Sequence, residues 1–74
     1  MSQLPILSGK DIIKVLERIG YHRGKQRGSH IRLTHSEFRS VTVPNYPSVS
    51  RGLLRKILRD AELSPAEFIK IVKQ

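Results

Sequence analysis

The feature of this sequence that most limits its fold is a hydrophobic period that changes twice along the chain. Between Ser8 and Gly20 the apolar residues recur at three- and four-residue steps, which places them on one face of a helix. Between Tyr21 and Val43 apolar and polar residues alternate instead, as they do in half-buried strands. After Ser50 the helical spacing returns. The pattern therefore predicts a small sheet between amphipathic helices.

Capping residues indicate where the helices begin and end. Ser8 and Ser50 are predicted N-caps of the first two helices, and Gly20 is a suitable terminator of the first. The run Ser64-Pro65-Ala66-Glu67 has the form of a capping box with proline at the first helical position. It predicts a third, short helix that places Phe68 in the core.

The alternating region predicts strands near residues 21–25, 29–35 and 40–44, with connections short enough for an antiparallel meander. The glycine-flanked run Gly24-Lys25-Gln26-Arg27-Gly28 is the predicted turn between the first two. One face of this sheet is expected to carry Ile31, Leu33, Val41 and Val43 toward the helices, and the other to carry His30, Arg32 and Thr42 toward solvent. The predicted fold class is α+β: a two-layer sandwich of a three-stranded antiparallel sheet on helices, in the order α-β-β-β-α-α.

Length and composition narrow the function classes. A chain of 74 residues has room for one domain, residues 1–74. It contains no cysteine, which excludes disulfides and thiol chemistry. Its first residues lack the charged leader and apolar stretch of a signal peptide, and no segment is long and apolar enough for a bilayer span, so we expect a cytoplasmic protein without membrane contact.

Positive charge is abundant and clustered. Lysine and arginine number 14 against 6 acidic residues, a formal net charge of +8. Acidic residues are absent from 18–36 and again from 38–59. Such a surface favours binding to nucleic acid, and the alternative is a basic face that is merely solvated. A DNA-binding regulator that uses residues 53–61 as a recognition helix is less favoured, because no helix-turn-helix spacing precedes that segment.

The glycine-flanked turn is the strongest candidate for phosphate contact. Its glycines let the backbone approach a phosphate, Lys25 and Arg27 supply charge, and Ser29 supplies a hydroxyl. The alternative is a plain β-turn in which the glycines only reverse the chain. The residues predicted to bind RNA are Lys25, Gln26, Arg27, Gly28, Ser29 and Arg32.

His30 follows this turn and is the candidate catalytic residue. An imidazole accepts and donates protons near neutral pH. RNA carries its own nucleophile, the ribose 2′-hydroxyl, so one histidine among cations can suffice for slow cleavage. The alternative is an ordinary surface histidine that stacks on a base or is simply solvated.

The remaining histidines and aromatic residues are weaker candidates. His22 and His35 have no comparable frame of glycines and cations, so we interpret both as structural or incidental. The three histidines are not expected to converge on a metal ion, and we expect neither a metal site nor a cofactor. Tyr46 is the one aromatic residue expected to be exposed, within the turn Pro44-Asn45-Tyr46-Pro47.

Taken together, several of these segments resemble the HicA-type messenger-RNA interferase toxins of prokaryotic toxin–antitoxin pairs, a family whose fold looks like the double-stranded-RNA-binding domain. The distinctive part is Gln26-Arg27-Gly28-Ser29-His30. The other matching segments are Ser8-Gly9-Lys10-Asp11, Leu16 through Tyr21, Val41-Thr42-Val43-Pro44, Gly52 through Leu58, Leu63-Ser64 and Phe68.

The resemblance implies an endoribonuclease that cleaves mRNA without a metal ion, with His30 as its catalytic residue. It also implies a HicB-type antitoxin that covers this histidine; we expect the free chain to be monomeric and to form a hetero-oligomer with the antitoxin. Two departures stand out: family members often carry a histidine where this chain has Asn45 and Tyr46, and Gly-Thr-Leu where it has Gly52-Leu53-Leu54. The alternative function is a non-catalytic RNA-binding adaptor.

Overall fold

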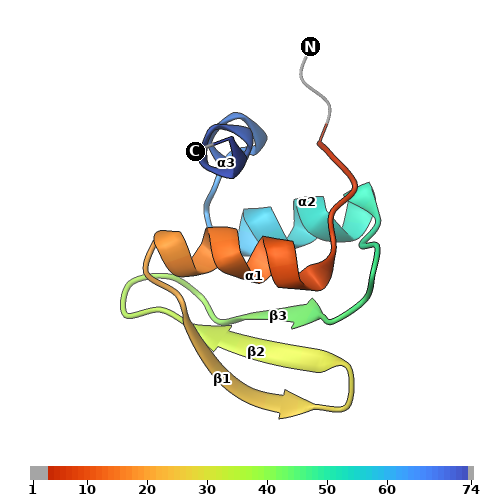
Figure 1. Ribbon diagram of the computed structural model, residues 1–74. Helices are drawn as coiled ribbons and strands as arrows, with labels where there is room; N and C mark the ends of the chain where they lie inside the picture. The colour runs from red at the N-terminus through yellow and green to blue at the C-terminus, as the bar shows by residue number, and fades with distance from the viewer. Residues whose placement is uncertain (1–3, 74) are drawn as a thin grey trace.

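The computed structural model describes residues 4–73, which form one sheet and three helices (Figure 1). The predicted domain, residues 1–74, and the N-terminal segment in which no leader is expected both extend beyond this range. Along the chain the elements are α1 (Gly9–Arg18), β1 (His22–Arg27), β2 (His30–Thr34), β3 (Val41–Pro44), α2 (Arg51–Asp60) and α3 (Pro65–Val72). The predicted α+β class and the order α-β-β-β-α-α are confirmed.

Each helix begins at the serine predicted to cap it. The capping hydroxyls accept backbone N–H groups in three pairs: Ser8 from Asp11 at 3.2 Å, Ser50 from Leu53 at 3.3 Å and Ser64 from Glu67 at 3.1 Å. The Ser64 hydroxyl also donates to Glu67 Oε1 at 3.0 Å, so the glutamate of this capping box meets the side chain of the cap. The helices have 10, 10 and 8 residues, and within residues 4–73 none combines the length and apolar character needed to cross a membrane.

The sheet is an antiparallel meander with β2 in its centre. Ile31 and Leu33 of β2 are buried beside their β3 partners Val43 and Val41, on the face that the helices cover. The opposite face carries the three residues expected there, His30, Arg32 and Thr42, and all are exposed. The predicted alternation is therefore confirmed for β2 and β3.

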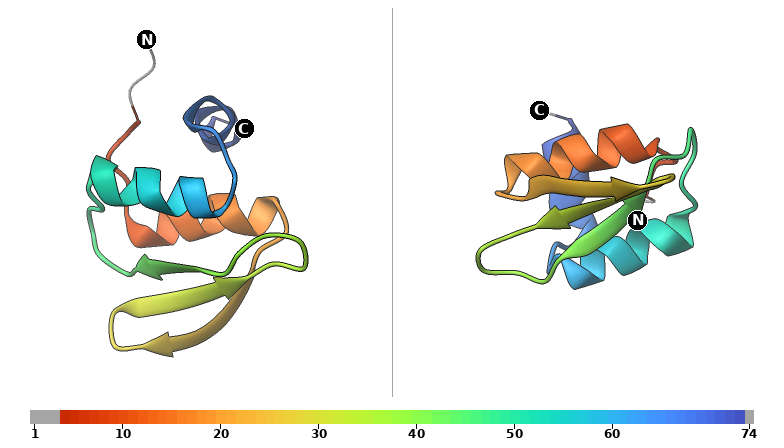
Figure 2. Two further views of the ribbon diagram at one scale, coloured as in Figure 1. Left: turned by 180° about the vertical axis from the view of Figure 1, so that it is seen from behind. Right: turned by 90° about the horizontal axis from the view of Figure 1, so that it is seen from below.

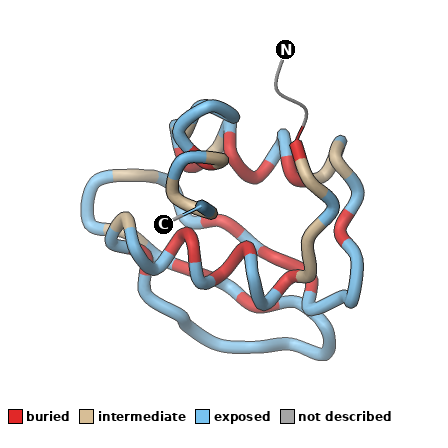
Figure 3. Tube along the Cα trace, turned by 45° about the horizontal axis from the view of Figure 1, so that its top comes forward, coloured by how far each residue is buried: buried red, intermediate tan, exposed pale blue. Residues whose placement is uncertain are grey.

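The helices lie on one side of the sheet. α1 and α2 run side by side next to β3, and α3 crosses them on the side away from the sheet (Figures 1 and 2). Phe68 of α3 is fully buried, as predicted, so α3 closes the core from that side. By contrast, every residue of the edge strand β1 is exposed (Figure 3). The core therefore forms between the helices and the inner face of β2 and β3.

The predicted turn between the first two strands is wrong. β1 continues to Arg27 and β2 begins at His30, so the turn consists of Gly28 and Ser29 alone and not of the run from Gly24 to Gly28. The φ of Gly28 is 56°, as expected for the first central residue of a type II′ hairpin turn, a position that favours glycine. The hairpin is therefore longer and tighter than predicted.

Gly24 lies instead at a β-bulge within β1. Arg23 pairs with Leu33 and Gln26 with Ile31, so β1 has one more residue than β2 between these two pairs. A Cβ at Gly24 would lie 3.2 Å from the Arg32 carbonyl oxygen, which is closer than most Cβ contacts in proteins. Glycine suits a bulge and a turn equally well, and this explains why the sequence pattern pointed to the wrong residue.

Candidate nucleic-acid interface

His30 is the first residue of β2 and follows the hairpin turn directly. Its side chain is exposed because Ile31 and Leu33 occupy the inner side of the strand, and neighbouring residues of a strand project to opposite faces. Within the sheet it lies between Arg27 of β1 and Pro44 of β3. The imidazole is thus open to solvent at one end of the exposed sheet face.

The bulge in β1 puts Arg27 on the same face as His30. Residues directly opposite each other in an antiparallel pair share a face, with Cβ atoms about 4.5–5.5 Å apart. Arg23 pairs with the inward-facing Leu33, so regular alternation would also turn Arg27 inward; the extra residue reverses this. Arg32 lies two positions beyond His30 on the same face. We call Arg27, His30 and Arg32 the sheet-face group.

The other residues predicted to bind RNA have different surroundings, although all are exposed. Gln26 Nε2 donates to the Gly28 carbonyl at 2.8 Å, so this side chain braces the turn. The Ser29 carbonyl accepts the Asn45 N–H at 2.5 Å, which ties the turn to the loop after β3. Lys25 lies in the bulge. Only part of the predicted set therefore surrounds the imidazole.

The loop after β3 brings Tyr46 to His30, a contact that the sequence did not reveal. The two ring centroids are 6.3 Å apart and the planes are inclined by 71°, within the range of edge-to-face aromatic pairs. The loop is held against α1, because the Gly9 N–H donates to the Tyr46 carbonyl at 2.9 Å. Gly9 is also packed against Pro44 so closely that a Cβ there would overlap the Pro44 carbonyl oxygen.

Beside Tyr46 lies a shallow depression of about 300 Å³. Its lining residues are Ser8, Lys10, Asn45, Tyr46 and Pro47. Lys10 was not among the predicted site residues. Its signals in the sequence were its place in the matching segment Ser8-Gly9-Lys10-Asp11 and the Gly9 before it, since a glycine at the start of a helix is compatible with close approach of another segment. The depression thus brings a further cation, Lys10, beside Tyr46 and close to His30.

His35, as expected, has a structural role. Its Nδ1 accepts the Glu37 N–H at 2.9 Å, and its Nε2 lies 2.9 Å from the Ile19 carbonyl oxygen. A carbonyl only accepts hydrogen bonds, so these two partners select the neutral tautomer protonated at Nε2. The ring also packs on Tyr21 and Phe38, at centroid distances of 4.9 and 4.7 Å. This imidazole connects the end of α1 to the loop after β2.

Tyr21 has a structural role as well, in contrast to the exposed Tyr46. It is only 2% exposed, and its hydroxyl donates to the Arg39 carbonyl at 2.7 Å. Burial raises the pKa of Tyr21 above its ordinary value of 10.0, and the carboxylates of Asp60 and Glu62 raise it further. This tyrosine therefore belongs to the core.

The three histidines do not converge on one site. His22 begins β1 and pairs with Thr34, at the end of the hairpin opposite the turn, whereas His30 lies beside the turn. Within residues 4–73 no group of three or more histidine, cysteine or acidic side chains is arranged to hold a metal ion.

A second cationic surface lies on α2, which packs on the covered side of the sheet. Arg55, Lys56 and Arg59 are exposed there. Arg51, at the start of the same helix, is used differently, because its Nε donates to the Leu4 carbonyl at 2.6 Å and anchors the segment before α1. Lys56 lines a hollow with Thr42 at the edge of the sheet, whereas Arg55 and Arg59 line one with Leu63 and Pro65 beside α3. Positive charge thus faces solvent beside the helices as well as on the sheet.

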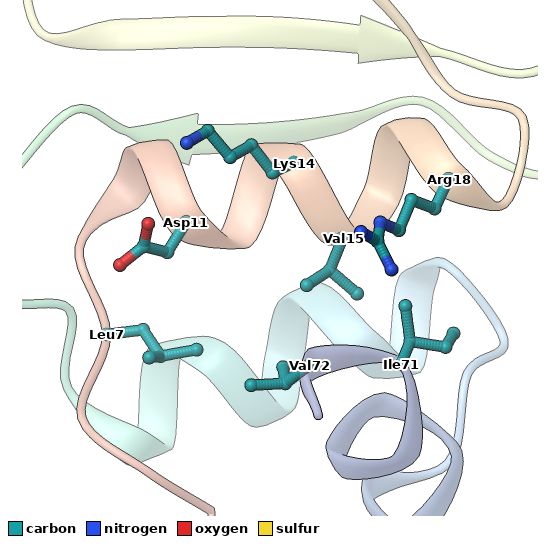
Figure 4. A pocket seen from close by; sticks show the side chains of 7 residues that line it. All are labelled: Leu7, Asp11, Lys14, Val15, Arg18, Ile71 and Val72. Carbon is teal, nitrogen blue, oxygen red and sulfur yellow. The ribbon is translucent and has the colours of Figure 1, made fainter. Parts of the chain in front are cut away.

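A groove of about 210 Å³ separates α1 from α3 (Figure 4). It is lined by Leu7, Asp11, Lys14, Val15, Arg18, Ile71 and Val72. It lies on the side of α1 away from the sheet, and none of its residues belongs to the predicted site (Figures 1 and 4). It contains no histidine, so acid–base chemistry near neutral pH is better served by the sheet-face group.

A comparison with known protein families gives a match over most of the chain. The family model described as the HicA toxin of bacterial toxin–antitoxin systems matches residues 9–63. This range runs from the start of α1 past the end of α2 and includes every predicted site residue. A search among curated proteins gave no match.

Proposed function

Because the chain belongs to the HicA family of toxins from bacterial toxin–antitoxin systems, we propose that it is an endoribonuclease that cleaves mRNA with His30 as general acid or base. The observation that carries this proposal is the exposed imidazole of His30, directly opposite Arg27 on the open face of the sheet. A ribose phosphate can reach this imidazole without any movement of the core. The protein would act where mRNA is translated, in the cytoplasm.

The chemistry requires little from the protein. The ribose 2′-oxygen attacks the adjacent phosphorus, the bond from phosphorus to the 5′-oxygen breaks, and the products are a 2′,3′-cyclic phosphate and a free 5′-hydroxyl. Neutral His30 accepts the proton of the 2′-hydroxyl, or its protonated form donates to the leaving 5′-oxygen, and water serves the other step. Such acid–base assistance typically contributes about 10²–10⁴-fold. No metal ion is needed for this route.

Arg27 and Arg32 have electrostatic roles in this scheme. The pentacoordinate phosphorane carries more negative charge than the phosphodiester, so a guanidinium beside the imidazole stabilises it more than the ground state. We assign this role to Arg27, because it is the direct cross-strand partner of His30. To Arg32, two positions along the strand, and Lys25, in the bulge, we assign the contacts with neighbouring phosphates.

The test is His30→Ala, assayed on RNA in the presence of a chelator. Loss of the imidazole is expected to slow cleavage by about 100-fold or more, whereas RNA affinity changes little because the cations remain. His22→Ala is the matched control, since this histidine is also exposed but lies at the far end of the hairpin. If His30→Ala cut RNA at the parental rate, the proposed catalytic role would be wrong.

We further propose that a HicB-type antitoxin inhibits the enzyme by covering the sheet-face group. A chain with a net charge of +8 suits an acidic partner surface. We expect the free toxin to be monomeric and the inhibited state to be a hetero-oligomer. Bound antitoxin should therefore abolish cleavage and protect His30 from acylation by diethyl pyrocarbonate, and unchanged modification of His30 would contradict this docking site.

A non-catalytic RNA-binding adaptor is the second candidate. It is favoured by the exposed Arg55 and Arg59 of α2, because they line a hollow beside the start of α3 and have no part in the proposed reaction. The two candidates separate in one experiment: purified protein with RNA in chelator either yields cleavage products, or binds the RNA and leaves it intact.

A further inference from the structure

Tyr46 is a large aromatic side chain left in solvent. Within residues 4–73, Tyr46 and Ile6 are the exposed large hydrophobic residues, with 43% and 49% of their surface accessible. Exposed hydrophobic residues that occur singly need no explanation. Tyr46 differs from Ile6 because it stands next to the candidate catalytic imidazole and lines a depression that also contains Lys10.

The backbone that carries this ring is held on two sides. The Gly9 N–H donates to the Tyr46 carbonyl at 2.9 Å, which fastens the loop to the start of α1. The preceding residue, Asn45, donates its N–H to the Ser29 carbonyl at 2.5 Å, which fastens the loop to the hairpin turn. Gly9 allows this approach only because it has no Cβ. The backbone of Tyr46 is therefore held in place, which reduces the entropy lost when its ring binds a ligand.

The position relative to His30 suits one nucleotide. The ring centroids are 6.3 Å apart and the planes are inclined by 71°. A neighbour in this edge-to-face arrangement leaves aromatic surface uncovered, in agreement with the exposure of Tyr46. A base and the phosphate attached to its own ribose are separated by a similar length, so a phosphate at His30 brings its base within reach of Tyr46.

We propose that Tyr46 is the stacking platform for the nucleobase beside the phosphate that reacts at His30, and that Lys10 contacts a flanking phosphate of the same RNA strand. This inference rests on the proposed function, since it requires a single-stranded RNA substrate. Stacking of bases on aromatic side chains holds single strands with little sequence preference. The tyrosine thereby fixes the register of the strand, so that a phosphate rather than a base faces the imidazole.

The experiment uses an RNA that cannot be cut. A single-stranded oligoadenylate, fully 2′-O-methylated and with one central 2-aminopurine, lacks the nucleophile but retains bases and phosphates. Its affinity and its 2-aminopurine fluorescence are measured with the parental protein, Tyr46→Ala, Tyr46→Phe and Ile6→Ala. Circular dichroism verifies that each variant is folded, which is expected because both side chains are exposed.

We expect Tyr46→Ala to weaken binding by about tenfold or more and to lose the quenching of 2-aminopurine that stacking causes. Tyr46→Phe keeps the ring and is expected to bind within about twofold of the parent, and so is the control Ile6→Ala. A Lys10→Ala variant should weaken binding but retain the quenching, because it removes a charge and not the platform.

Three results would overturn the inference. The first is parental affinity and quenching in Tyr46→Ala. The second is a Tyr46→Phe variant as weak as Tyr46→Ala, which would assign the effect to the hydroxyl. The third is a parental protein that does not bind the oligonucleotide at all. Because this RNA is not cleaved, failure of the nuclease proposal shows separately, as unchanged cleavage of ordinary RNA by His30→Ala.

Discussion

His30 and His35 flank the central strand β2, one at its first residue and the other just beyond its last. The ring of His30 is exposed to solvent, and the centroid of the Tyr46 ring lies 6.3 Å from its own. The ring of His35 is held by two backbone groups and two aromatic neighbours. The same side chain therefore serves packing at one end of the strand and is free for chemistry at the other.

Replacing His35 with alanine should destabilise the fold and leave His30 and its neighbours unchanged. The change leaves the Glu37 N–H and the Ile19 carbonyl without their partner and removes a ring from the Tyr21 cluster, so we expect the free energy of unfolding to fall by about 1–3 kcal/mol. In a domain of this size that lowers the melting temperature by about 4–8 °C per kcal/mol. Urea or thermal unfolding measures the effect.

His30→Ala is the matched comparison for this prediction. An exposed side chain without packing partners in the core is expected to change stability by no more than about 0.5 kcal/mol when truncated. The two variants should thus show opposite phenotypes: one unstable but active while folded, the other stable and inactive. A loss of no more than about 0.5 kcal/mol in His35→Ala would show that the contacts of His35 carry no net stabilisation.

Among the elements, those defined by neighbouring residues were predictable and those defined by distant residues were not. The three serine caps act within four residues of chain, so the sequence alone located the start of each helix. The alternation around Ile31 and Leu33 likewise defined the inner face of β2. The bulge at Gly24 was not predicted, because only pairing with β2 distinguishes a bulge glycine from a turn glycine.

The candidate site was predictable to a similar extent. His30 followed from its position after a glycine turn in an alternating strand, and its exposure agrees with that prediction. Tyr46 and Lys10 lie close to His30 only because Gly9 of α1 packs against the loop after β3. No periodicity or cap in the sequence encodes a contact between the first helix and that loop. Tyr46 and Lys10 could therefore be identified as neighbours of His30 only from the folded structure.

The contact between α1 and the loop after β3 gives a prediction for Gly9→Ala. The added Cβ would overlap the Pro44 carbonyl oxygen and lie 3.0 Å from the Asn45 Cα, and both are backbone atoms that cannot turn aside as a side chain does. We expect a loss of about 1–3 kcal/mol in the free energy of unfolding. Displacement of the loop should also move Tyr46 from His30 and slow RNA cleavage further than the stability loss explains.

Gly52→Ala is the control for this prediction. Gly52 also lies near the start of a helix, but a Cβ there would have no neighbour within 4 Å. Alanine reduces the freedom of the unfolded chain without strain, so we expect a gain of about 0.4–1 kcal/mol. Denaturant unfolding and cleavage rates of both variants test the pair. A Gly9→Ala variant as stable and active as Gly52→Ala would show that the loop is not held by this contact.

Exposed positive charge is divided between the open sheet face and the helical side of the protein. The molecule measures 35 × 27 × 20 Å. Arg55 and Arg59 of α2 line a hollow with Leu63 and Pro65, beside the start of α3, and α3 lies on the side of α1 and α2 away from the sheet. At physiological ionic strength the Debye length is about 8 Å, so charges on one side are largely screened from a polyanion bound on the other. The two groups should therefore contribute unequally to RNA binding if the strand lies across His30.

Two double variants that remove the same charge measure this asymmetry. Arg27→Ala with Arg32→Ala, and Arg55→Ala with Arg59→Ala, each lower the formal net charge by two, from +8 to +6. The logarithm of RNA affinity falls with the logarithm of salt concentration by about 0.7 for each phosphate neutralised on a single strand. The sheet-face variant should therefore reduce this slope by about 1.4, and the α2 variant should leave it nearly unchanged. Equal slopes in the two variants would mean that RNA contacts both sides, and a larger loss in the α2 variant would move the binding surface away from the imidazole.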